Sequence, residues 1–316
     1  MPSDMQQQAS SSAPITTVEA FRARCRGGLS GVVVRGIDLA GLDLRGSDLS
    51  GARMEDVDLT EADLSQCVLR GTVFEGSELL GVNLTGSDLQ GVDLSRSRLV
   101  TTKVAGADFR GAKIVQGDLT GSELRQVKVQ GARLERCLLV GVRGEGVDFR
   151  GCDLLDSSFG GAKLAGALFV EARASQASFT EADLTRAMFV RTSAPFARFG
   201  GANLEDANLD GADLRGATFA RARMARASLR GAKLVRSLWD HADARGARFD
   251  MSDLSFADLS HVMADMASFQ KANLDRANLH RTSLASAVLS GANLGGVRKT
   301  DPDRAKAEDF SMGGRG

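Results

Sequence analysis

Residues 162–184 read AKLAGALFVEARASQASFTEADL, and this stretch decides the fold. Bulky apolar residues recur five positions apart, as in Leu164 and Phe169 or Phe179 and Leu184, and an alanine stands two positions before each. The same register runs without insertion from Leu39 to Leu294, and 47 of its 52 central positions hold Leu, Ile, Val, Met, Phe or Trp. A period of five fits neither a helix nor a simple strand. It predicts short extended steps, each followed by a turn.

Large aromatic rings repeat with a longer period of 20 residues. When the central residues are written in four columns, the rings fall in two opposite columns, and only Phe74 stands elsewhere. One column contains Phe159, Phe179, Phe199, Phe219 and Trp239, and the other contains Phe109, Phe149, Phe169, Phe189, Phe249 and Phe269. Large residues on two sides and small ones on the others suit a narrow close-packed core. We therefore expect four repeats per coil, about 13 coils in all, and stability dominated by contacts between neighbouring coils.

The repeat unit, as in Ala62-Asp63-Leu64 and Ala202-Asn203-Leu204, resembles the pentapeptide-repeat family, whose motif is A(D/N)LXX. The resemblance implies an all-β fold, a right-handed quadrilateral parallel β-helix (a solenoid) with short helical caps. The expected organisation is a disordered tail over 1–13, an N-terminal cap with a short helix over 14–33, the β-helix over 34–296, and a C-terminal cap helix and tail over 297–316.

The N-terminal cap has a helix-start pattern. Thr16 and Glu19 have the spacing of a capping box. Val18, Phe21 and Cys25 then share one helical face, which we expect to cover the first coil.

The C-terminal cap has a helix-start pattern too. Asp301 is a suitable N-cap residue, and Pro302 stands at the first helical position. The pattern predicts a helix over 303–310 that covers the last coil. We expect a mobile tail over 313–316.

Composition excludes several classes of protein. The 316 residues contain 40 basic and 40 acidic side chains, a balance that argues against direct nucleic-acid binding. No apolar run approaches membrane-spanning length, and the N-terminus lacks the pattern of a secretory signal. Four cysteines without a CxxC pair favour a reducing, cytoplasmic setting. Export by a secretion system that needs no signal peptide stays open.

Candidate catalytic and metal-binding residues are few. Three of the four cysteines occupy the inward position two before a central residue, where small core residues stand, namely Cys67, Cys137 and Cys152. His241 and His261 are one coil apart, so their rings are expected to stack. The nearest further metal ligands would be Asp240, Asp258 and Asp265. A solvated pair is the favoured interpretation, and no metal or cofactor is predicted. The third histidine, His280, lies in no recognisable catalytic motif, so we expect no enzyme.

Some outward positions are apolar where the rest of the surface is polar. The expected partner-binding patch consists of Leu168, Val170, Met188 and Val190, with Pro195 and Phe196 around the following corner. Four more outward apolar residues are Met251, Phe256, Met263 and Met266. Contiguous exposed apolar residues are typical of protein-binding surfaces. The alternative is that apolar side chains simply suit a sheet surface.

Charge is unevenly distributed along the chain. An acidic end is expected from Asp38, Asp43, Asp48, Asp58 and Asp63. A basic belt is expected from Arg221, Arg223, Arg226, Arg230, Lys233 and Arg236.

These features favour a non-enzymatic, bacterial protein-binding scaffold or adaptor. The resemblance also allows a link to a bacterial secretion system, and coil ends or the C-terminal cap would support self-association. The alternative implied by the resemblance is a DNA-mimicking binder of DNA gyrase, of the quinolone-resistance type. The basic belt weakens that alternative and restricts it to the acidic end.

Overall fold

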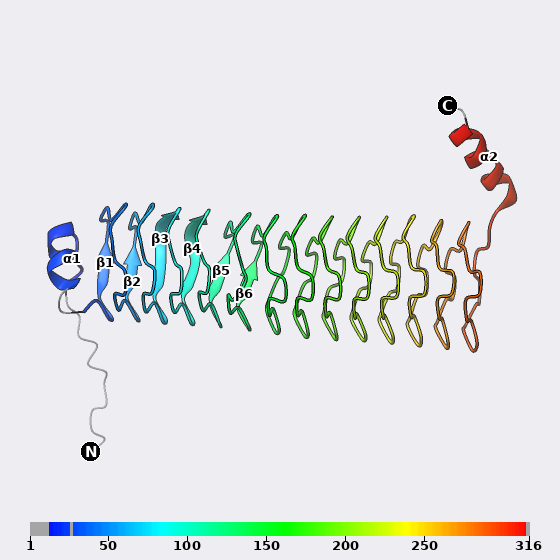
Figure 1. Cartoon of the computed structure of the whole chain (residues 1–316), viewed down its shortest axis with the longest axis horizontal. Coiled ribbons are helices and arrows are strands. Elements are labelled where there is room, and N and C mark those ends of the chain that lie inside the picture. The colour runs from blue at the N-terminus through cyan, green and yellow to red at the C-terminus, as the bar shows by residue number, and fades with distance from the viewer. Residues whose placement is uncertain (1–12, 26–27, 314–316) are drawn as a thin grey trace, which may run out of the picture.

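The computed structural model describes residues 13–25 and 28–313 and shows an elongated solenoid with a short helix at each end (Figure 1). The elements in chain order are α1 (Val18–Cys25), β1 (Val33–Arg35), β2 (Arg53–Glu55), β3 (Val73–Leu80), β4 (Asp93–Val100), β5 (Lys113–Val115), β6 (Arg133–Glu135) and α2 (Pro302–Gly313). The expected disordered tail falls mostly on 1–12. The expected mobile tail over 313–316 falls mostly on 314–316, whereas Gly313 ends α2, which continues past the predicted end at 310. The ranges 1–12 and 314–316 lie outside the described residues.

Backbone pairing is parallel and joins residues 20 positions apart. In the sheet, Met54 pairs with Phe74, and at the C-terminal end Asn278 pairs with Arg298. Four five-residue units therefore separate paired residues, as the ring columns predict. The six strands form one sheet in the order β1 to β6, and beyond β6 the same offset continues as isolated bridges. The parallel β-solenoid is confirmed. The six strands form five pairings with one another, fewer than a stack of 13 coils would require. The count of about 13 coils and the right-handed winding remain predictions.

Outside the strand pair β3–β4, the five-residue units turn at the second residue after the central one. The φ angle is positive there, for example 63° at Gly141 and 58° at Arg221. Glycine suits this conformation because it has no Cβ to clash with the backbone. The aspartate before the central residue stabilises the turn, since the Oδ1 of Asp38 accepts a hydrogen bond from the amide of Ala40 at 2.9 Å. The Asp or Asn of the motif thus has a structural role that the sequence did not reveal.

The core consists of the central residues and the small residues two positions before them. Phe179 stacks on Phe159 and on Phe199 at 5.0 and 5.1 Å between ring centroids. It also meets Phe169 and Phe189 of the other ring column edge-on, both at 5.4 Å. All these rings are fully buried. The two predicted aromatic columns therefore interlock across the core.

The strand pair β3–β4 departs from the regular coil. Glu75 pairs with Arg96, one residue out of the 20-residue register, and Arg96 lacks the positive φ of the other turns. An ion pair of 2.5 Å between the same two side chains accompanies the extended strand. The unbroken sequence register therefore includes one local β-bulge.

Helix α1 lies against the N-terminal end of the solenoid, and its Phe21 is fully buried, as predicted. The capping-box prediction is wrong by one residue, because Thr17 rather than Thr16 is the N-cap. Its Oγ1 accepts from the amide of Ala20 at 3.2 Å. The chain is still extended just before the helix, since Ile15 pairs with Val34.

Helix α2 starts as predicted, with Asp301 as its N-cap. The Oδ1 of Asp301 accepts from the amides of Asp303 and Arg304. The expectation that this helix covers the last coil is wrong. Helix α2 projects to the side of the rod (Figure 1), and Leu294 of the last coil is 46% exposed. Polar contacts hold the helix there, including a hydrogen bond from Arg281 Nη2 to the Ala305 carbonyl.

Candidate functional surface

Two apolar features that the sequence grouped together lie on different sides of the coil. The first, here called the apolar strip, consists of Leu168, Val170, Met188 and Val190. Leu168 and Met188 are paired across neighbouring coils. Met188 is 38% exposed, and the other three residues are half-buried.

The apolar strip interrupts a series of charged residues on its side of the rod. Towards the N-terminus the same columns carry Asp108 with Arg110 and Asp148 with Arg150, each pair joined at 2.6 Å. Towards the C-terminus the columns return to polar residues, beginning with Asn208 and Asp210. The strip is therefore a limited apolar area within a polar surface.

Pro195 and Phe196 contribute to a separate feature, here called the corner groove, of about 340 Å³. Phe196 is 62% exposed. Its ring lies so close to Gly216 that a Cβ there would be 2.7 Å from the ring. The other residues that line the corner groove are Arg215, Val235 and Arg236.

The other outward apolar residues are exposed, as expected. Phe256 is 44% exposed, and the guanidinium groups of Arg236 and Arg276 lie 5.8 and 5.4 Å from its ring centroid. Met251, Met263 and Met266 are 56%, 42% and 66% exposed.

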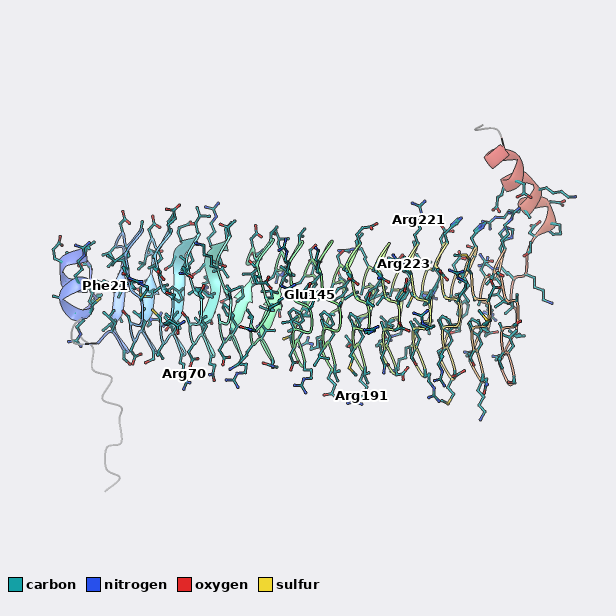
Figure 2. All side chains as sticks on the ribbon, viewed as in Figure 1. Phe21, Arg70, Glu145, Arg191, Arg221 and Arg223 are labelled. Carbon is teal, nitrogen blue, oxygen red and sulfur yellow. The ribbon has the colours of Figure 1, made fainter. Side chains whose placement is uncertain are left out.

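The basic belt is less positive than its sequence suggests. Arg223 pairs with Glu205, Arg226 with Asp206 and Arg230 with Asp250. These carboxylates are 18 to 20 residues away along the chain but adjacent across coils. Arg221 and Arg223 lie on the C-terminal half of the rod (Figure 2). Three members of the belt have no carboxylate partner within 4 Å among the described residues, namely Arg221, Lys233 and Arg236.

The acidic end has the expected ladders, with Asp38 paired to Asp58 and Asp43 to Asp63. Arg45 lies between Asp43 and Asp63, at 2.7 and 3.9 Å. Its hydrogen bonds lower the pKa of Asp43 to about 2.

Hydrogen bonds within the turns lower the pKa values of three further aspartates of the acidic end. Hydrogen bonds from Ser50 lower the pKa of Asp48, and those from Thr60 and Ser65 lower the pKa values of Asp58 and Asp63. These carboxylates are therefore ionised at neutral pH.

The three inward cysteines are core residues, as predicted. Cys67, Cys137 and Cys152 are at most 1% exposed. Burial raises the pKa of Cys67 to about 11 and those of the other two to about 12. Thiolate chemistry is therefore suppressed at these positions.

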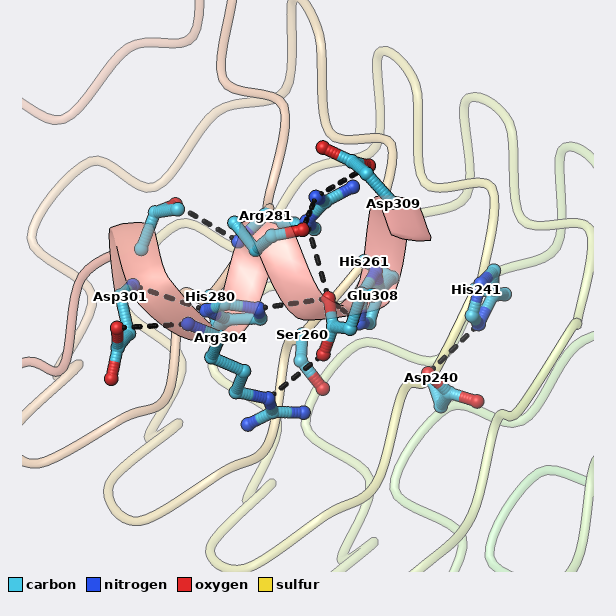
Figure 3. Close-up of polar contacts among 12 residues, drawn as sticks. Asp240, His241, Ser260, His261, His280, Arg281, Asp301, Arg304, Glu308 and Asp309 are labelled. Carbon is cyan, nitrogen blue, oxygen red and sulfur yellow. Dashed lines mark hydrogen bonds and ion pairs between the residues drawn. The ribbon is translucent and has the colours of Figure 1, made fainter. Parts of the chain in front are cut away.

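The histidines lie close together near the C-terminal end (Figure 3). His241 and His261 stack at 4.7 Å, as predicted, and Asp240 contacts His241 at 2.8 Å. The other suggested ligands face different partners, because Asp258 binds Asn278 and Asp265 binds the amide of Ala285.

The sequence did not reveal the contact between His280 and Glu308. His280 is 2% exposed, and its Nε2 lies 3.1 Å from Glu308 Oε2. Potential ligand atoms of His261, His280 and Glu308 lie within 4.8 Å of one another. However, the Nδ1 of His280 accepts a hydrogen bond from the amide of Asp301. This leaves the proton of the neutral ring on Nε2, where a metal would have to bind.

The cluster also carries its own cations. Arg281 and Arg304 contact Glu308 at 3.2 and 2.8 Å. A hydrogen-bonded ion-pair cluster that holds α2 accounts for this arrangement. No repeat position signals Glu308, because it belongs to α2 and not to the repeat.

No helix within 13–25 or 28–313 is long and apolar enough to cross a membrane.

Among solved structures, three similar chains are pentapeptide-repeat or resistance proteins. A pentapeptide repeat protein from the Arabidopsis thaliana thylakoid lumen is 28% identical, covers 33% of this chain and 75% of its own, and has a TM-score of 0.26. HetL, a pentapeptide repeat protein involved in heterocyst differentiation regulation in the cyanobacterium Nostoc sp. strain PCC 7120, is 24% identical over 88% and 94% of the two chains, with a TM-score of 0.23. QnrB1, a plasmid-mediated fluoroquinolone resistance protein, is 18% identical over 68% and 95%, with a TM-score of 0.28.

No curated protein sequence matches the chain. The model of pentapeptide repeats, in contrast, matches eight copies over residues 29–66, 62–99, 105–139, 130–164, 157–193, 197–234, 227–262 and 267–298. With its repeat, its 20-residue pairing and its inward-facing central residues, the chain belongs to the pentapeptide-repeat family.

Proposed function

We propose that this repeat-protein scaffold is a non-enzymatic adaptor that docks another protein on the sides of its rod. The observation that carries the proposal is the apolar strip, because it places an exposed Met188 and three half-buried apolar residues together on a polar surface. The adaptor is proposed to be a right-handed quadrilateral rod of about 13 coils, so that each side is a flat docking face.

The test is affinity capture from the source cell with a double variant, Leu168→Asp with Met188→Asp. The matched control is Leu138→Asp with Ser158→Asp, which alters the same repeat position in two successive coils of another side. Leu138 is 45% exposed, comparable to Met188. We expect the first variant to lose a partner that the control keeps. Equal capture by both folded variants would contradict docking on the strip.

The setting proposed for this adaptor is the bacterial cytoplasm, with export through a signal-independent secretion system as the alternative. Support comes from the four free cysteines, three of which are buried. Fractionation of source cells tests the proposal, because recovery of the chain in the culture medium would favour the secretion route.

Self-association through the C-terminal end is also proposed. Leu284 and Leu289 of the last coil are only half-buried, and Leu294 is exposed. Open edges of stacked strands pair readily with another chain.

DNA mimicry toward gyrase is the second candidate. It is favoured by one observation, the ladder of ionised aspartates at the acidic end. Arg45 counts against it, because it lies between Asp43 and Asp63 and interrupts the negative potential. A gyrase supercoiling assay tests it: lack of inhibition or drug protection at micromolar protein would eliminate this candidate.

A further inference from the structure

We propose that the corner groove binds an acidic segment of a partner protein, in which Asp or Glu lies beside a bulky apolar residue. This inference rests on the proposed scaffold function and assigns partner chemistry to a second surface. Its site is distinct from the apolar strip, because Pro195, Phe196 and Val235 lie on other units of the coil.

Apolar side chains form one part of the corner groove. Phe196 is exposed over 62% of its surface, and Pro195 and Val235 line the same hollow. Its volume of about 340 Å³ lies within the common range for ligand pockets, roughly 300–1,000 Å³, and therefore accommodates a bulky side chain.

The turn position of Phe196 usually carries glycine or a polar residue. Its φ of 60° is shared by many non-glycine residues at this position, among them Arg221 at 58° and Phe256 at 59°. The side chain, and not the backbone, therefore distinguishes Phe196, because a large aromatic ring is left 62% exposed. An exposed aromatic ring beside other apolar side chains is typical of a binding surface.

Charge identifies the kind of partner. Arg236 lines the corner groove and has no carboxylate within 4 Å among the described residues. Arg215, also in the lining, is already paired with Asp213 at 2.6 Å. The groove itself contains no acidic residue. A carboxylate of the partner therefore supplies the negative charge that balances Arg236.

The contacts of Arg236 also fix its position. Its guanidinium lies 5.8 Å from the centroid of Phe256, and the ring face attracts the cation. Because the group is held against this ring, less side-chain freedom is lost when it binds a carboxylate.

A nucleic acid fits the groove less well than an acidic peptide. Binding to a phosphate backbone needs several cations along a continuous path. Here one free arginine lines the groove, and the chain as a whole has no net charge.

The experiment is selection of a random-peptide phage library on the full-length protein, with counter-selection on Phe196→Asn and on Arg236→Gln. Asparagine is chosen because it tolerates the positive φ of Phe196. We expect the peptides that bind only the wild-type groove to be rich in Asp or Glu next to Phe, Leu or Trp. A labelled consensus peptide should bind each groove variant about tenfold more weakly than the wild type.

A control variant, a charge-reversed variant and a thymidine oligonucleotide complete the experiment. Leu168→Asp, on the apolar strip, should bind the consensus peptide with unchanged affinity, and Arg236→Glu should favour basic peptides instead. The inference is overturned if no peptide depends on the groove, if the selected peptides lack acidic residues, or if a thymidine oligonucleotide binds in their place. Such a failure leaves the scaffold proposal standing if the strip variant still loses its captured partner.

Discussion

The two ends of the rod show how differently similar helices can meet a stack of coils. At the N-terminal end, α1 inserts Phe21 against the first coil and buries it completely. At the C-terminal end, α2 is attached to the side of the rod through Glu308, and Leu294 stays 46% exposed. An apolar contact covers the core at one end, whereas a polar contact leaves it open at the other.

The difference shows that a helix beside the last repeat is not sufficient to close a solenoid. Helix α2 contacts His280 and Arg281 through the carboxylates of Glu308 and Asp309 and through the backbone carbonyl of Ala305. These are polar contacts with the rim of the rod. A cap needs an apolar side chain that is buried in the core of the end coil, as Phe21 is.

A substitution in the middle of the core should destabilise the protein more than a substitution at either end. Phe179→Ala should destabilise the protein by about 3–5 kcal/mol, because it removes a ring enclosed by four others and leaves a cavity. Urea unfolding followed by circular dichroism measures the loss. Outward Arg230→Ala is the control, and a loss as large as that of Phe179→Ala would contradict the assignment of inward and outward positions.

Phe21→Ala tests the closed end. The free energy of unfolding of this end should fall by about 3 kcal/mol, because a buried phenylalanine is removed but the cavity opens toward water. Hydrogen exchange of the residues near α1 measures their unfolding. If exchange in the first coils is unchanged, α1 does not act as a cap.

Leu294→Lys tests the open end. A charge on this exposed edge should weaken self-association about tenfold, as measured by sedimentation velocity over a range of concentrations. Leu138→Lys, an equally exposed site away from the ends, should have no effect. A chain that stays monomeric in all three forms would rule out the proposed end-to-end contact.

The smallest effect is expected for the lateral attachment of α2. The hydrogen bond from His280 lowers the pKa of Glu308 in the folded protein. The attachment is therefore fully present above the ordinary glutamate range and is lost as pH falls through this lowered pKa. Hydrogen exchange of 302–309 should increase at acidic pH, and Glu308→Gln should increase it already at neutral pH. Glu19→Gln in α1 is the control, and unchanged exchange in the Glu308 variant would contradict the attachment.

The repeat made the core predictable, but it did not predict the β-bulge or the ion pairs of the basic belt. Phe179 and Cys152 could be placed because every unit repeats the same local geometry. The bulge at Arg96 could not, because no residue there departs from the motif. The charge of the basic belt was overestimated because Arg226 was counted against its sequence neighbours, whereas its partner Asp206 lies one coil away.

The candidate surface was predictable only in its composition. Outward apolar residues such as Met188 and Phe196 could be identified from their repeat positions. That they belong to two separate surfaces depends on how the units are arranged around the coil. The contact of His280 with Glu308 was missed because it joins the repeat to a helix that has no repeat phase.

Methionine footprinting of the rod with its captured partner tests the docking proposal most directly. Met188, Met263 and Met266 are all exposed in the free chain, so hydroxyl radicals should oxidise all three. If a partner docks on the apolar strip, oxidation of Met188 should fall in the complex while that of Met263 and Met266 stays the same. Unchanged oxidation of Met188 in a complex of confirmed composition would contradict the proposed docking site.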